Sequence, residues 1–252
     1  MKDNVHGKHR ERMRDRFILN GIDNMSPHEA LELMLYYVIP RCDTNPLAHE
    51  LIDTFGSFSG VLDASVEDLA AIKGVGKKTA VFLKLFLDVN RFYEVDKTSN
   101  MKTFTTIDDV GRFLRPRFLG RRDELVIMLS LDTKNSLIAQ QVLFEGNVNS
   151  VGFDIRKMVG SALRLNAANI ILAHNHPGGV AVPSMKDVQT TEHLRNVMSG
   201  VNLKLLDHLV FAGEEFVSIC QSKIYKEEKA KNARVIAFSQ EPSDYAESSD
   251  LL

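Results

Sequence analysis

Apolar residues in the first hundred positions recur at helical spacing. The sequence Ser26-Pro27-His28-Glu29 combines an N-cap, a first-turn proline and a capping acid, and apolar residues follow it at positions 30, 31 and 33–35, as in a buried helix. Asp43 to Asn45, before a proline, predicts the start of another helix, and the pattern at 65–86 predicts two more. Polar residues at 94–100 then interrupt the pattern. A small all-α domain is therefore predicted over residues 1–98.

After residue 102 the pattern changes to short apolar runs that alternate with helical ones. Helices are predicted at 106–118, at 153–165 and after Ser184, and strands at 125–131, 136–144, 170–173, 201–211 and near Phe216. The near-continuous apolar runs are typical of a sheet covered on both faces. We therefore predict an α+β chain in which the helical domain is followed, over residues 102–224, by an α/β domain with a mixed sheet. The polar and acidic residues 225–252 predict a disordered tail.

Composition narrows the class of protein. The chain has 252 residues, of which 44% are hydrophobic and 25% charged, as in ordinary globular domains. Its net charge of -2 excludes wholesale electrostatic attraction to nucleic acid, so any such contact must come from a local patch. Cys42 and Cys220 are the only cysteines, which excludes a disulfide framework and a cysteine-based zinc site. No apolar run approaches membrane-spanning length, and we predict a cytoplasmic protein without a membrane partner.

Two histidines follow the apolar run at 170–173. His174 and His176 are two positions apart, and because side chains along a strand alternate between faces, both imidazoles are expected to point the same way. Pro177 and the two glycines after it end the strand at this point. The strand therefore stops where the histidines need open space.

Asp187 lies in the first turn of the next predicted helix. A strand end that faces a helix start would bring two imidazoles and one carboxylate together, which is a known catalytic zinc set with a fourth position left for water. The sequence predicts one Zn²⁺ per chain, held by His174, His176 and Asp187. The alternative is local: Ser184 with Asp187 three residues later is nearly a capping box, which needs no metal.

The residues from His174 to Asp187 resemble a family signature. His-x-His-Pro, six further residues and Ser-x-x-Asp is the pattern of the JAMM (JAB1/MPN) metalloproteases, and the match has no gap. With Leu206-Asp207-His208 downstream, the chain is similar to the bacterial RadC proteins, long labelled DNA repair proteins. RadC proteins usually have serine where Gly178 stands, in the turn and outside the ligand set. The resemblance implies an MPN fold, which is cytidine-deaminase-like, and a zinc-dependent metalloprotease.

The same resemblance implies further roles. JAMM enzymes place a general-base glutamate at the start of a strand upstream of the histidines, and Glu124 matches that position. Glu145, which follows its strand and precedes a glycine, is the rival candidate. Ser184 is expected to hydrogen-bond the tetrahedral oxyanion, as its counterpart does in the family. Asp207 and His208 are interpreted as a structural pair or as support for the ligands rather than as ligands.

Residues 65–90 resemble a helix-hairpin-helix. A capped short helix, a tight turn and a longer helix follow one another, and a helix N-terminus offers free amides to a phosphate. Such a module grips the DNA backbone without reading bases. The predicted DNA contacts are Lys73, Gly74, Gly76, Lys77 and Lys78. A plain helical hairpin also needs glycine at its turn, and DNA-binding examples usually pair two hairpins, of which one is visible here.

Three functions compete at this point. The first is a zinc-dependent peptidase or isopeptidase with an unknown protein or peptide substrate. The second is a metal-dependent nuclease or phosphoesterase, although one zinc with two histidines and one aspartate suits amide hydrolysis better than the two-metal arrangement of phosphate cleavage. The third is a DNA-bound adaptor with an idle metal site. A cytidine deaminase is excluded, because no Cys-x-x-Cys accompanies the histidines.

Overall fold

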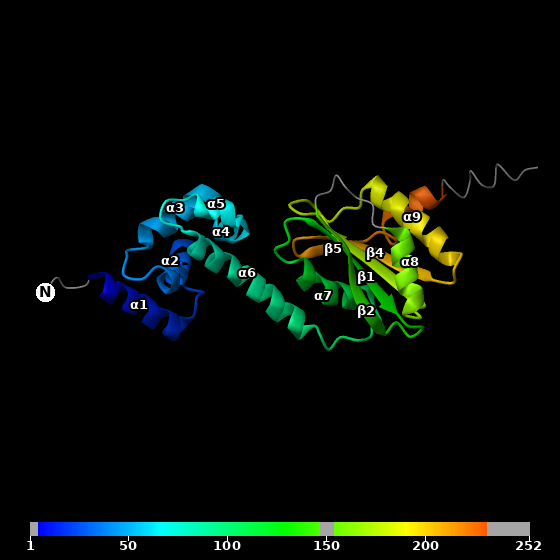
Figure 1. Cartoon of the computed structure of the whole chain (residues 1–252), viewed down its shortest axis with the longest axis horizontal. Helices are drawn as coiled ribbons and strands as arrows, with labels where there is room; N and C mark the ends of the chain where they lie inside the picture. The colour runs from blue at the N-terminus through cyan, green and yellow to red at the C-terminus, as the bar shows by residue number, and fades with distance from the viewer. Residues whose placement is uncertain (1–4, 147–153, 231–252) are drawn as a thin grey trace, which may run out of the picture. The chain divides into compact units, whose positions relative to one another are not determined.

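The computed structural model describes residues 5–146 and 154–230 (Figure 1). It divides into two compact units, Met1–Lys97 and Thr98–Leu252. Within the described ranges, no helix is both long enough and apolar enough to cross a membrane.

The first unit is entirely helical. It contains α1 (Val5–Asn20), α2 (Pro27–Val38), α3 (Asn45–Phe55), α4 (Phe58–Asp63), α5 (Val66–Ala70) and α6 (Lys77–Lys97). The capping box predicted at Ser26 is present, and α2 lies at the centre of the core, with Leu31 and Leu35 fully buried. Side chains of α3 to α6 complete that core, among them Leu51, Leu69 and Leu83.

Glu29 ties the start of α2 to α1. Its carboxylate accepts two hydrogen bonds from the Arg16 guanidinium, at 2.7 and 2.9 Å, and one from the Ser26 backbone amide at 2.8 Å. Mainly because of the bond from Arg16, and then of that from Ser26, the pKa of Glu29 falls to about 2. Since the folded pKa lies below the unfolded value, the contribution to stability is present above about pH 4.5 and is lost as the pH falls toward 2.

Glu29→Gln is therefore expected to lower the free energy of unfolding by about 1 to 2 kcal/mol at pH 7, because it removes a charged cap and an ion pair. The difference from wild type should shrink steadily between pH 5 and pH 3, as measured by denaturant titration at each pH. The matched control is Glu50→Gln on the exposed side of α3. A loss that does not depend on pH would contradict this account.

The second unit is an α/β domain built on one mixed sheet. Its elements are α7 (Ile107–Phe118), β1 (Glu124–Leu131), β2 (Leu137–Gly146), α8 (Ile155–Arg164), β3 (Asn169–Asn175), α9 (Met185–Ser199), β4 (Lys204–Ala212) and β5 (Glu215–Ser218). The strand order is β2-β1-β3-β4-β5; β3 and β4 are parallel, and the other pairs are antiparallel. The predicted α+β class and mixed sheet are confirmed. The start predicted for α8, at residue 153, lies outside the described residues.

Helices cover both faces of the sheet. Alternate residues of β1, such as Ile127 and Leu129, pack with Phe113 and Leu114 of α7 on one face. Met128 of β1 packs on the other face with side chains of α8 and α9, including Met158, Leu194 and Met198. The central strands are therefore buried on both sides, which explains their continuous apolar sequence.

The prediction for the polar segment after residue 224 needs correction. Residues 223–230 are helical, and Tyr225 is buried against Val188 and Val210, so the disorder predicted from residue 225 is wrong for residues 225–230. Residues 231–252 lie outside the described residues. Arg117 of α7 is a buried charged residue: it lies over the Phe113 ring and donates hydrogen bonds to Gln140 and Thr98. Burial lowers its pKa to about 10.

Candidate metal centre

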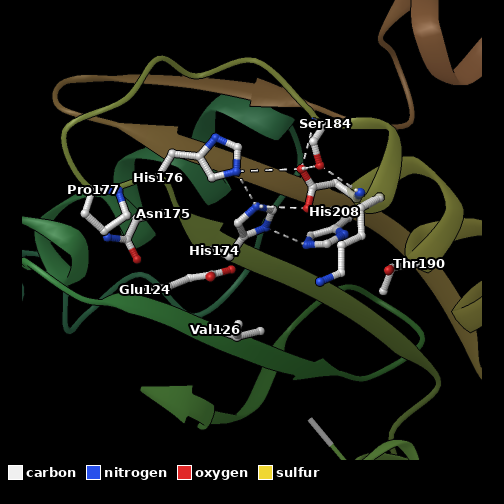
Figure 2. Close-up of a pocket in the computed structure, with 11 residues that line it drawn as sticks. Glu124, Val126, His174, Asn175, His176, Pro177, Ser184, Thr190 and His208 are labelled. Atoms are coloured by element: carbon white, nitrogen blue, oxygen red, sulfur yellow. Dashed lines mark hydrogen bonds and ion pairs between the residues drawn. The ribbon is translucent and has the colours of Figure 1, made fainter. Parts of the chain in front are cut away.

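The end of β3 places two imidazoles on one face of the sheet. His174 pairs with Val126 of β1 and with Val210 of β4, and the strand ends at Asn175. The backbone amide of His176 still donates to the Phe211 carbonyl at 2.8 Å, which keeps this residue in line with the strand. The Nε2 atoms of His174 and His176 lie 3.0 Å apart (Figure 2). The alternation of side chains expected from the sequence therefore holds at this strand end.

Asp187 approaches these imidazoles from the first turn of α9. The Ser184 backbone amide and hydroxyl both donate to Asp187 Oδ2, at 2.7 and 2.6 Å, and the Asp187 amide donates to Ser184 Oγ at 3.2 Å. This capping box holds the carboxylate with Oδ1 3.4 Å from His174 Nε2 and Oδ2 3.6 Å from His176 Nε2. The capping box and the converging carboxylate are therefore the same structure, not alternatives (Figure 2).

The donor atoms of His174, His176 and Asp187 fit a metal ion. One ligand atom from each lies within 4.8 Å of the others, and the three residues range from buried to half-buried. The His176 Nδ1–H points to the Val180 carbonyl at 3.3 Å, so the Nε2 lone pair of this ring faces the other two groups. Two imidazoles and a carboxylate that converge in this way form a set that can hold a metal ion.

The electrostatics of the three groups agree with that chemistry. Burial lowers the pKa of His174 to about 4, so its imidazole is neutral, as a metal ligand must be. Burial acts to raise the pKa of Asp187, but the neighbouring His176 ring and the hydrogen bonds from Ser184 outweigh it, so the pKa lies well below its usual range. The Asp187 carboxylate beside it raises the pKa of His176, because it favours the protonated ring. An ionised carboxylate thus faces two nitrogen donors.

His174, His176 and Asp187 line a cavity with a volume of about 320 Å³, and Glu124, the first residue of β1, lines it too. Its side chain points toward His174 in Figure 2. Burial raises the pKa of its carboxyl group, against the opposing effect of His176. Its Oε2 atom is buried and has no hydrogen-bond partner. Buried and unpartnered carboxylate oxygens are costly, so this atom marks a position where a polar group is expected to bind.

Asn175 contributes to the site in a way that the sequence did not suggest. Its Oδ1 accepts a hydrogen bond from the Leu125 amide at 2.7 Å, and its Nδ2 donates to the Asp123 carbonyl at 3.1 Å. These two backbone groups flank Glu124, so the amide fixes the backbone on both sides of it. The role depends on strand pairing across 50 positions, and local sequence carries no signal for it.

Of the other three residues considered for the site, Glu145 and Asp207 point away from the two histidines and His208 points toward them. Glu145 pairs with Leu125 on the α7 face of the sheet and forms an ion pair with Arg121 at 2.5 Å, so it does not face the two histidines. Asp207 also turns away from the site and accepts hydrogen bonds from Ser218 and from the His208 amide. His208 turns toward the site and contacts His174. The Asp207-His208 pair is therefore split between the two faces of its strand.

The predicted DNA-contacting residues lie in the other unit. Lys73, Gly74, Gly76, Lys77 and Lys78 are all exposed and follow one another from the end of α5 into α6. Gly74 has a φ of 94°, which explains why glycine is needed there. Gly76 has neither a positive φ nor any atom within 4 Å of a Cβ built on it. Nothing within the described residues therefore requires glycine at position 76.

Comparisons with known proteins agree with this architecture. Residues 104–225 match a family described as RadC-like JAB domain, and residues 6–81 match one described as UPF0758 N-terminal. A UPF0758 protein of Ruegeria pomeroyi is 37% identical over 80% of this chain and 90% of its own length. UPF0758 proteins of a Polaromonas species and of Carboxydothermus hydrogenoformans are 33% and 30% identical over 83% and 85% of this chain, and over 94% and 95% of their own lengths. These names state a family and no activity.

Proposed function

This chain belongs to the UPF0758 family and carries a RadC-like JAB domain, and from this premise we propose that it is a zinc-dependent metallopeptidase or isopeptidase associated with DNA. One observation carries the proposal. The Nε2 atoms of His174 and His176 and the carboxylate of Asp187 converge beside the buried, unpartnered Oε2 of Glu124. A hydrolytic zinc site needs three protein ligands and a nearby carboxylate that can act as a general base.

The mechanism follows from the position of each side chain. His174, His176 and Asp187 would hold zinc, which when bound lowers the pKa of water to about 7 and polarises a carbonyl. Glu124 takes the proton from the attacking water and returns it to the leaving amine; burial raises its pKa toward neutral pH, which makes the carboxylate a stronger base for the first transfer. The Ser184 hydroxyl now donates to Asp187, and it rotates to donate to the tetrahedral oxyanion.

The choice between amide and phosphate hydrolysis rests on the ligand set. Among the described residues, one group of three ligands is found, whereas phosphate cleavage commonly uses two metals about 4 Å apart. The test is to incubate the zinc-loaded chain with peptide and isopeptide substrates and, in parallel, with labelled duplex, branched and single-stranded DNA. Cleavage of peptide bonds alone supports the proposal. Cleavage of DNA alone would establish the nuclease alternative, and cleavage of neither would favour an adaptor with an idle site.

The association with DNA rests on the hairpin between α5 and α6. Val75 is 2% exposed and anchors the turn in the core, while the lysines and glycines on either side of it are exposed. Gly76 stands one residue before α6, where free amides and the positive end of the helix dipole can bind a phosphate. No atom of the described residues lies within 4 Å of a Cβ built on Gly76, so a DNA backbone can approach this position closely.

Gly76→Ala is expected to weaken binding of duplex DNA about fivefold, the effect of losing about one hydrogen bond to a phosphate. Its melting temperature should fall only slightly, because the added methyl group meets no atom of the described residues and the cost is limited to the weaker N-cap preference of alanine before α6, below about 1 kcal/mol. Binding is measured by fluorescence anisotropy at fixed salt concentration. Gly74→Ala is the contrasting variant, since its positive φ predicts a loss of stability. Unchanged affinity in Gly76→Ala would count against the DNA contact.

A further inference from the structure

Three buried side chains form a line that ends at the metal centre. Thr191 of α9 is fully buried, His208 of β4 is 3% exposed, and His174 is 2% exposed. Thr191 Oγ1 lies 2.8 Å from His208 Nδ1, and His208 Nε2 lies 2.9 Å from His174 Nδ1. The second link is drawn in Figure 2. The line begins in the core and reaches the ring nitrogen of His174 that faces away from Asp187.

The direction of the first hydrogen bond follows from counting protons. The Thr191 hydroxyl lies 2.6 Å from the Asp187 backbone carbonyl, which can only accept. The single hydroxyl proton is therefore used in that bond. Thr191 Oγ1 must then accept from His208, so the proton of the His208 ring lies on Nδ1.

The direction of the second bond follows from the first. His208 is buried, and both groups that it bonds are neutral, so a second proton on this ring would be a buried, unpaired charge. With its one proton on Nδ1, His208 presents a lone pair at Nε2 and must accept from His174 Nδ1–H. The lone pair of His174 then lies on Nε2, on the side of His176 and Asp187.

We propose that Thr191 and His208 are positioning residues that hold His174 in the Nδ1–H tautomer and so keep its Nε2 free to bind a metal. This inference rests on the proposed function only for the identity of the metal.

The opposite tautomer of His174 would also find hydrogen-bond partners within the site. With its proton on Nε2, His174 could donate to His176 Nε2 at 3.0 Å or to Asp187 Oδ1 at 3.4 Å. That network would satisfy the three ligands among themselves and close the site to a cation. Ligating histidines commonly have their tautomer fixed by a carboxylate or a carbonyl. Here His208 fixes the tautomer of His174. It can do so because Thr191 holds the proton of the His208 ring on Nδ1.

The direct test is the tautomer of each ring in the metal-free protein. Long-range ¹H–¹⁵N correlation spectra of the ¹⁵N-histidine-labelled chain distinguish Nδ1–H from Nε2–H, and single substitutions assign the rings. We expect Nδ1–H for both His208 and His174. Nε2–H at His174 in the metal-free wild type would overturn the inference.

Zinc affinity, measured by chelator competition, supplies the second test. His208→Phe fills the same space but accepts no hydrogen bond, and should weaken zinc binding about 10- to 100-fold. His208→Gln, whose side-chain oxygen can accept from His174 Nδ1–H, should restore most of that loss. Equal losses in the two variants, or no loss in His208→Phe, would mean that a hydrogen-bond acceptor at position 208 does not matter for zinc binding, which overturns the inference.

Thr191 is tested with a matched pair. Thr191→Val removes the oxygen that fixes His208, and the His174 signal should then report a mixture of tautomers, whereas Thr191→Ser should keep the wild-type spectrum. A pure Nδ1–H signal in Thr191→Val would remove Thr191 from the proposal. If the wild-type chain binds no zinc, the proposed hydrolase fails, whereas the tautomer of His174 still decides this inference.

Discussion

Replacement of His174 by alanine is expected to reduce bound zinc from about one per chain to less than about a tenth of that. The variant leaves two ligands where a catalytic zinc site uses three, and it removes the most deeply buried of them. Metal content is measured by mass spectrometry after zinc loading and dialysis. Zinc should also raise the melting temperature of wild type, because a ligand that binds only the folded state stabilises it, and it should not raise that of the variant.

A matched control lies on α9. His193 is exposed and outside the ligand group, so His193→Ala should retain about one zinc per chain. Asp187→Asn tests a second of the three proposed ligands with little change in shape, and its zinc content should fall as in His174→Ala. If His174→Ala keeps as much zinc as His193→Ala, these three side chains are not the metal site. A correctly folded variant is recognised by its unchanged circular dichroism spectrum.

The parts of the fold that sequence could predict are those fixed by local periodicity. The capped helix at Ser26, the strand that Glu124 begins and the strand end at His174 each have their signal within a few residues. The spacing of His174 and His176 was informative because a strand turns every second side chain to the same face. In the same way, the position of Asp187 in the first turn of α9 was enough to aim its carboxylate.

The parts that sequence could not predict depend on strand pairing. Asn175 lies between the two histidines, and the sequence indicates no role for it. In the structure it holds the backbone around Glu124, because β1 and β3 are neighbours in the sheet. The contact of His208 with His174 depends on the parallel pairing of β3 with β4. This pairing places the two rings side by side, although they are 34 positions apart in the sequence. The prediction of disorder from residue 225 was wrong for a related reason. Tyr225 lies in a charged stretch of sequence, and its apolar contact with α9 depends on the tertiary fold.

Glu124→Gln is expected to keep the zinc and lose the reaction. The amide has nearly the same shape as the carboxylate and is outside the three-ligand group, so metal content should stay near one per chain. It cannot take a proton from water, and removal of a general base lowers turnover about 10²- to 10⁴-fold. The measurement is the rate of peptide-bond cleavage in a defined peptide and isopeptide library, followed by mass spectrometry of new termini.

Glu145→Gln gives this experiment its control, because the rival glutamate differs from Glu124 in position and not in chemistry. Its carboxylate is paired with Arg121 on the α7 face, so the substitution should leave the rate of cleavage unchanged. A loss of rate in Glu145→Gln with normal rates in Glu124→Gln would reverse the assignment of the base. If instead DNA is the substrate cut by wild type, and Glu124→Gln abolishes that cutting, then the carboxylate serves a nuclease. The geometry of the base would stand in that case, and the amide substrate would not, because a positioned carboxylate activates water whatever bond the water attacks.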